Sequence, residues 1–201
     1  MAVTRRWGIG LTNFLLPAPL HESIAQAFGG LQRLSLRFGD SSWESDDEKP
    51  HNMLPGRVAG LAALTTFLAH SVPNLEVLVI SHYDLDEYLA DRGVQHAVFK
   101  ACLGATNTYA KLREVSLVRS AFYVDDLISF ARRHASTLRK IDMKVCVLLD
   151  DGTYIWAYEP IPDEEPEPFE ESTVEALQQI SKAMNLPQLE LTAQGDEDGD
   201  M

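Results

Sequence analysis

A short apolar pattern recurs along this chain and constrains its fold more than any other feature. The pattern is Leu-x-x-Leu-x-Leu with conservative replacements, found as LQRLSL, LEVLVI, LREVSL and LRKIDM from residues 31, 75, 112 and 138. LPQLEL, from residue 186, is a candidate fifth copy whose register is uncertain. One such hexamer is not informative, because any amphipathic strand can supply it. Several copies indicate a repeat architecture in which neighbouring units bury one another's apolar faces.

A helical pattern precedes the later copies. Apolar residues recur at helical spacing within 58–69 and 124–135, residues 93–103 favour a helix, and Ser172-Thr173-Val174-Glu175 has the spacing of a capping box. Alternation of helix and strand predicts parallel strands with helices on the other side. The expected fold class is therefore α/β, a short irregular leucine-rich-repeat solenoid with a parallel sheet on one face and helices on the other.

The spacing of the copies predicts long insertions. The hexamers begin 44, 37, 26 and 48 residues apart, whereas regular leucine-rich repeats are about 20–29 residues long. We expect acidic loop insertions at about 39–56 and 150–171 and a further loop over 81–92. All of them follow a strand and should leave the same sheet edge. One domain is predicted over 1–194, followed by an acidic disordered tail, 195–201.

Charge is concentrated in three acidic runs. The formal net charge is -13, from 30 acidic and 17 basic residues. Residues 40–48, 159–171 and 196–200 hold 5, 7 and 4 of the acids, which leaves 14 acids against the 17 bases elsewhere. Such runs are most often solvated loops and tails. They would repel a phosphate backbone, so we expect no nucleic-acid partner.

Cysteine usage and hydropathy point to an intracellular protein. Cys102 and Cys146 are the two cysteines, and no charged-then-apolar leader opens the chain. Free thiols in a reducing compartment are therefore expected. The longest helix-like apolar stretch, Val58 to Ala69, is shorter than the roughly 20 residues that a bilayer requires. The predicted localisation is cytoplasmic or nuclear, with no membrane partner.

Residues suited to catalysis or metal binding are sparse. One loop contains four residues of types that bind metals, but no second cluster completes a metal shell. A solvated acidic loop is therefore the favoured interpretation. Those four are His82, Asp84, Asp86 and Glu87. His134 lies near an expected helix end, where a positive charge is favourable, and we interpret it as structural. Phosphate-loop, nucleophile-elbow and dinucleotide motifs are absent. We expect no enzyme, catalytic residue, metal or cofactor.

Several phrases carry a family resemblance. They are VPNLEVLVI, YAKLREVSLVRSAF, VDDLISFARRHASTLRKIDM and the connection to GTYIW. Over roughly Leu31 to Leu149, the chain resembles the irregular leucine-rich-repeat region of F-box-type proteins, particularly the divergent fungal kind. The resemblance implies a substrate receptor of a cullin-based ubiquitin ligase, whose F-box holds a Skp-type adaptor and whose repeats hold the target.

The sequence departs from that family in two places. Leu16-Pro17, Leu20, Ile24 and Phe28 match only the opening of an F-box, so a Skp-type adaptor is expected only if an F-box lies upstream. At the ninth repeat position, where the family has Asn or Cys, Cys146 alone fits. The four residues at that position are Gly39, Tyr83, Ser120 and Cys146.

The strand pattern predicts a binding face. Because side chains alternate along a strand, the leucine positions enter the core and repeat positions three, five and seven face outward. These positions combine a small valine centre with cations on both sides, and Glu114 is expected to pair with Lys140. The alternative is that valines simply suit strands. Trp43, among acids and serines, is a further interface anchor. The predicted protein-binding residues are Arg33, Arg37, Val77, Val79, Val118, Lys140, Lys144 and Trp43.

The function we expect is a non-enzymatic protein–protein interaction module, with substrate recognition in a ubiquitin-ligase setting as the role that the resemblance implies. The alternative is an acidic inhibitor or scaffold protein that binds a basic partner through its charged loops. Both ends of the repeat stack look uncovered, and the apolar segment 7–16 is a candidate remnant strand beside 31–36. Like-charged copies repel, so we expect a monomer.

Overall fold

A computed structural model of the chain describes residues 11–38, 55–82, 92–105, 107–144, 146–150, 153–156, 178, 181–182, 185–187 and 189–194. The elements in chain order are η1 (Leu11–Phe14), α1 (Ala18–Phe28), β1 (Arg33–Phe38), α2 (Pro55–Ser71), β2 (Val77–His82), α3 (Arg92–Leu103), β3 (Glu114–Val118), β4 (Ala121–Tyr123), α4 (Val124–Arg133), β5 (Lys140–Lys144), β6 (Val147–Asp150), β7 (Thr153–Trp156) and β8 (Glu190–Gln194).

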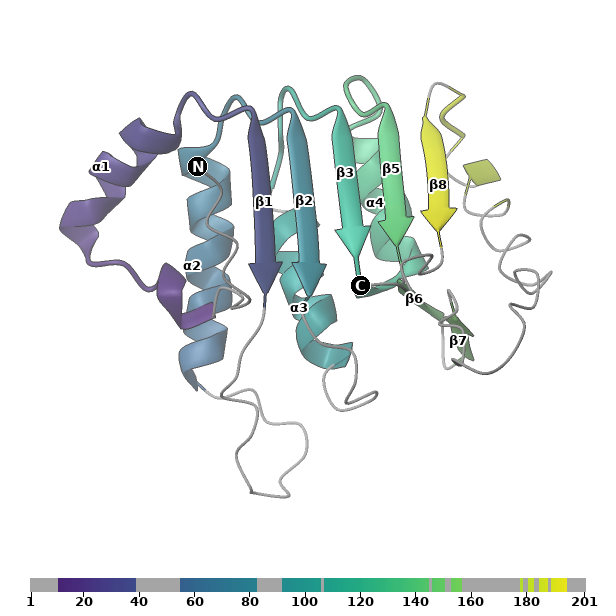
Figure 1. The fold of residues 1–201 in the computed structure, drawn as a ribbon, viewed down its shortest axis with the longest axis horizontal. Helices are drawn as coiled ribbons and strands as arrows, with labels where there is room; N and C mark the ends of the chain where they lie inside the picture. Colours follow the sequence, from purple (N-terminus) through teal and green to yellow (C-terminus); the bar gives the residue numbers. More distant parts are fainter. Residues whose placement is uncertain are drawn as a thin grey trace, which may run out of the picture.

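The main sheet has five strands in the order β1-β2-β3-β5-β8, and every neighbouring pair is parallel. Helices α2, α3 and α4 cover one face of this sheet, while α1 lies beyond the β1 edge (Figure 1). Within the described part of the chain, no helix covers the opposite face (Figure 1). The predicted α/β class, with a parallel sheet and helices on one side, is confirmed.

The same backbone hydrogen bonds recur from strand to strand. The carbonyl of Gln32 accepts the N–H groups of Glu76 and Val77, at 2.8 and 2.9 Å. The carbonyl of Glu76 accepts the N–H groups of Arg113 and Glu114, and the carbonyl of Arg113 accepts those of Arg139 and Lys140. Each hexamer therefore enters the sheet at an equivalent position, which fixes the register of β1, β2, β3 and β5.

The leucine positions of the hexamers form the core. In these four strands, the fourth and sixth positions are buried, and they are Leu34, Leu36, Leu78, Ile80, Val115, Leu117, Ile141 and Met143. The helices cover them with Leu64, Leu68, Val98, Phe99, Cys102, Leu127, Phe130 and Ala131. Helix α4 also has Asp125 and Asp126 in its first turn and Arg132 and Arg133 in its last, the arrangement that the helix dipole favours.

The N-terminal side of the fold differs from the prediction. We expected residues 7–16 to include a strand beside β1, but Leu11–Phe14 is a 3-10 helix packed against α2. Gly60 permits this contact, because a Cβ at Gly60 would overlap the backbone carbonyl of Leu11. Rings of Phe14 and Phe28 both pack on Phe67, with centroids 5.9 and 5.4 Å apart. Apolar packing on α2 thus competes successfully with strand pairing for this segment.

Two loop boundaries also need correction. Helix α2 begins at Pro55, inside the predicted 39–56 insertion, because proline is favoured in the first turn of a helix. Strands β6 and β7 pair antiparallel, and β7 lies inside the predicted 150–171 loop. Apolar runs on either side of Asp151-Gly152 are a strong hairpin signal, which the abundance of acids obscured. Strand β4 joins β6 in this second sheet.

Several predicted segments fall outside the described residues. They are the greater part of the first insertion, at 39–54, the acidic stretch 157–177 with the capping box, and the tail, 195–201. In the part of the chain with described helices, none is long and apolar enough to cross a membrane.

Candidate functional site

Outward residues of the main sheet line up in three rows across its strands, which we name by repeat position. Row three is Arg33, Val77, Glu114, Lys140 and Glu190; row five is Ser35, Val79, Ser116, Asp142 and Thr192; row seven is Arg37, Ser81, Val118, Lys144 and Gln194. In β1, β2, β3 and β5 these residues are exposed or half-buried and alternate with buried ones. The predicted alignment of the first four strands is confirmed.

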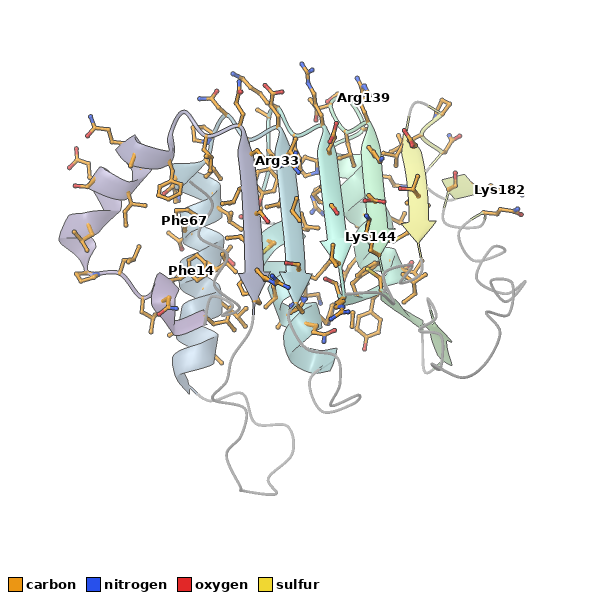
Figure 2. The ribbon with its side chains drawn as sticks, viewed as in Figure 1. Phe14, Arg33, Phe67, Arg139, Lys144 and Lys182 are labelled. Carbon is orange, nitrogen blue, oxygen red and sulfur yellow. The ribbon has the colours of Figure 1, made fainter. Side chains whose placement is uncertain are left out.

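A hollow of about 290 Å³ lies on this face over β1, β2, β3 and β5. Half-buried Val77, Val79 and Val118 give it an apolar centre. Arg33 on β1 and Lys144 on β5 are exposed (Figure 2), and their strands flank β2 and β3, which carry the valines. Seven of the eight predicted binding residues therefore share one sheet face; the eighth, Trp43, lies outside the described residues.

Strand β8 adds residues whose register the sequence left uncertain. Leu191, rather than Leu189, lies level with Ile141, so the strand is shifted by two residues from the expected alignment. Glu190, level with Lys140, donates its N–H to the Arg139 carbonyl at 2.8 Å, which is the bond that the third hexamer position makes in the earlier strands. The N–H of the preceding residue, Leu189, donates to the Leu186 carbonyl at 2.9 Å.

The shift changes the charge pairing of the face. The ammonium of Lys140 lies 3.9 Å from a carboxylate oxygen of Glu190, so the expected pairing of Lys140 with Glu114 is wrong. Thr192 Oγ1 donates to Asp142 Oδ1 at 2.7 Å. Lys144, in contrast, has no ion pair with any described residue. Glu190 of β8 thus partly neutralises row three, and Thr192 gives Asp142 of row five a hydrogen bond, while Lys144 has no ion pair with a described group.

Buried polar groups gather where β2, β3 and β5 end. His82 Nδ1 lies 3.2 Å from Ser120 Oγ, which itself donates to the Val118 carbonyl at 3.2 Å. The Nδ1–H of His82 therefore donates to Ser120, and Nε2 is buried without a partner among the described residues. Burial lowers the pKa of His82 to about 4, so its ring is neutral at physiological pH.

Cys146 belongs to the same edge and is inert as a nucleophile. Its thiol is buried and donates to the Leu117 carbonyl at 3.2 Å. Burial raises the pKa of this thiol to about 12 and that of the Cys102 thiol further. Because the thiolate is the reactive form, neither cysteine is activated. Cys146 and Ser120, at the ninth position of successive repeats, both tie the chain back to strand carbonyls.

The metal hypothesis for the His82 loop gains no support from the described residues, in which no three His, Cys, Asp or Glu side chains form a group suited to a metal ion. Asp84, Asp86 and Glu87 lie outside those residues.

His134 is structural, but not through the positive charge we expected. The backbone N–H of Tyr109 donates to its Nε2 at 3.1 Å, and its Nδ1 lies 3.0 Å from the Phe130 carbonyl, to which it donates. Both ring nitrogens are thus used by a neutral imidazole. Burial lowers the pKa of His134, which is consistent with that state. A cation beside a helix end requires solvent, and this ring is 4% exposed.

Buried caps on α3 were missed by the sequence reasoning. Asn107 Nδ2 donates to the carbonyls of Ala101 and Cys102, at 2.6 and 3.1 Å. Tyr109 Oη also donates to the Cys102 carbonyl, at 2.6 Å. These groups satisfy acceptors that the helix itself leaves unpaired. No periodic signal marks them, because they lie in a connection whose sequence, Ala105 to Ala110, looks like ordinary loop.

Comparisons of the chain with protein-family models, with curated proteins and with solved structures gave no significant match.

Proposed function

We propose that the chain is a non-enzymatic protein-binding module that holds a partner segment on the exposed face of its main sheet. One observation carries this proposal: in-register strands bring Val77, Val79 and Val118 together in a hollow flanked by Arg33 and Lys144. An apolar patch with a charged rim is a common form of protein interface. The partner segment that fits has apolar side chains and a net negative charge.

The same face argues for binding rather than chemistry. The described groups near it with shifted pKa values are the neutral His82 ring and the protonated Cys146 thiol, and on the face itself Lys140 forms an ion pair with Glu190. A reaction site normally combines a nucleophile or metal with an acid or base in one cleft. The rows supply shape, apolar area and charge, which suit recognition.

A repeat-type scaffold for target capture is the finer form of the proposal. It is supported by the equivalent entry of four hexamers into one sheet and by the carbonyl bonds of Ser120 and Cys146 at the ninth position. On this view the chain is an irregular leucine-rich-repeat module of the F-box-associated kind, which presents a target to a ubiquitin ligase. An association with a Skp-type adaptor would require an F-box outside this sequence.

A pair of valine variants tests the binding face. Val79→Asp places a carboxylate in the apolar centre, whereas Val58→Asp makes the same change at an α2 position that is 53% exposed. Quantitative affinity capture with the two variants and the unaltered chain should show partners lost with Val79→Asp and retained with Val58→Asp. Equal capture by all three chains, each folded, would contradict the proposal.

Salt dependence separates this proposal from binding through the acidic runs. Contacts made mainly by exposed charges weaken steeply as salt rises, whereas burial of an apolar centre does not. We expect capture to fall only a few-fold between about 0.1 and 0.5 M salt. Loss of all specific partners over that range would favour the acidic-scaffold alternative.

A further inference from the structure

Net positive charge on the sheet face is confined to row seven, at the carboxyl ends of the strands, because the two cations of row three, Arg33 and Lys140, share that row with carboxylates. Row three contains Glu114 and Glu190, and row five contains Asp142. Row seven has no acidic residue in any of its five strands, and it carries Arg37 and Lys144. Lys144 is exposed and has no ion pair with a described residue. An acidic group near the end of β5 would therefore meet a cation with no competing carboxylate in its row.

The chain itself delivers acidic groups to this place. Strand β8 ends at Gln194, the row-seven neighbour of Lys144. The residues that follow, 195–201, have the sequence GDEDGDM and contain four acids and no base; they lie outside the described residues. Neighbouring strands are about 4.8 Å apart, so Lys144 is one strand away from Gln194 and Arg37 is four, or about 19 Å. Seven extended residues span up to about 24 Å.

We propose that the acidic segment 195–201 binds in cis across row seven, contacts Lys144, and competes there with an acidic segment of the partner. The cis contact stands on the charge and connectivity of row seven alone, whereas the competition rests on the proposed function of the face. A tether this short holds the segment at an effective concentration in the millimolar range. Exposed ion pairs are individually weak and are screened by salt, so the segment is displaced by a partner that also fills the valine centre.

The test begins with two variants of matched charge. In the tail variant, D196N, E197Q, D198N and D200N remove four negative charges; in the control variant, D163N, E164Q, E165Q and E167Q remove four from the second acidic run. In amide NMR spectra at low salt, we expect the tail variant to shift the signals of Lys144 and Val118, and the control variant to leave them in place. Identical row-seven signals in all three chains would overturn the cis contact.

A peptide supplied in trans then measures the competition. The probe is QGDEDGDM, the sequence of residues 194–201, titrated to millimolar concentration while the Lys144 and Val118 signals are followed. It should bind the tail variant about fivefold more tightly than the control variant, because the control retains its tethered competitor. Adding Lys144→Gln to the tail variant should abolish the response, whereas Lys111→Gln, at the opposite end of β3, should not. Equal binding to both variants, or no loss with Lys144→Gln, would overturn the proposal.

The two proposals fail separately. If the peptide result holds but capture is indifferent to Val79→Asp, the cis contact stands and the protein-binding role of the valine centre is wrong. If capture depends on Val79 but the Lys144 and Val118 signals are the same in the tail variant and the unaltered chain, the binding face stands and the acidic segment is not its competitor.

Discussion

Two adjacent residues of β2 should respond in opposite ways to the same substitution. Leu78 is fully buried between its register partners Leu34 and Val115, while Val79 is half-buried and belongs to row five of the exposed face. The two Asp variants lie on the same strand, have nearly the same sequence neighbours, and introduce the same negative charge. A difference in stability between the variants therefore reports only the face that each side chain occupies.

The structure sets the size of that difference. Removing a fully buried leucine side chain costs about 2–5 kcal/mol, and an unpaired buried polar group adds about 1–3 kcal/mol. Leu78→Asp should therefore lose roughly 3–8 kcal/mol, which is comparable with the whole stability of many domains. Val79→Asp should lose about 1 kcal/mol, from strand preference and partial burial. The expected gap is at least about 2 kcal/mol.

Urea unfolding followed by circular dichroism measures the gap. With a slope of about 2 kcal/mol/M, the midpoint of Val79→Asp should exceed that of Leu78→Asp by at least about 1 M, or Leu78→Asp should be unfolded without urea. Equal midpoints for the two variants would show that Val79 belongs to the core, and the alignment of all three rows would then be wrong.

Further predictions concern pH, packing and assembly. Because burial lowers the pKa of His82 from 6.5 to about 4, protonation favours the unfolded chain; stability is complete above pH 6.5 and falls by about 3 kcal/mol toward pH 4. His82→Gln should remove that component of the pH dependence in denaturation curves, and an unchanged slope would refute it. Gly60→Ala should destabilise the chain despite the better helix propensity of alanine, since its Cβ overlaps the Leu11 carbonyl; a raised melting temperature would contradict this packing. Sedimentation should give a monomer at physiological salt with weak association at higher salt, whereas a stable dimer at low salt would identify an open sheet edge as an interface.

The hexamers allowed four strands and their facing directions to be predicted from the sequence, because the copies align position by position. Three of them alternate polar and apolar residues from position three to position six, and the alignment assigns the faces of LEVLVI, in which Val77 and Val79 are apolar as well. Arg33 and Leu34, or Val79 and Ile80, could be assigned to opposite faces without a structure. Regular backbone pairing between identical patterns then leaves one register that buries every leucine position.

Other features depend on information that a local pattern does not contain. The register of β8 is shifted by two residues from the hexamer alignment, and the Leu189 N–H bonds to the Leu186 carbonyl within its own connection. The pairing of Lys140 with Glu190 follows from that register. The neutral state of His134 and the caps from Asn107 depend on burial by distant residues, and the strand pair β6-β7 was hidden because its hairpin signal lies beside an acidic run.

The central claim, that the valine centre of the sheet holds the partner, is tested most directly by valine methyl NMR of the chain with its captured partner. Val77, Val79 and Val118 lie on the proposed face, whereas exposed Val58 lies on α2 and buried Val72 follows it. The account predicts that partner binding shifts the methyl signals of the first three and leaves those of Val58 and Val72 unchanged. Shifts at Val58 alone, with the three sheet valines unaffected, would contradict it.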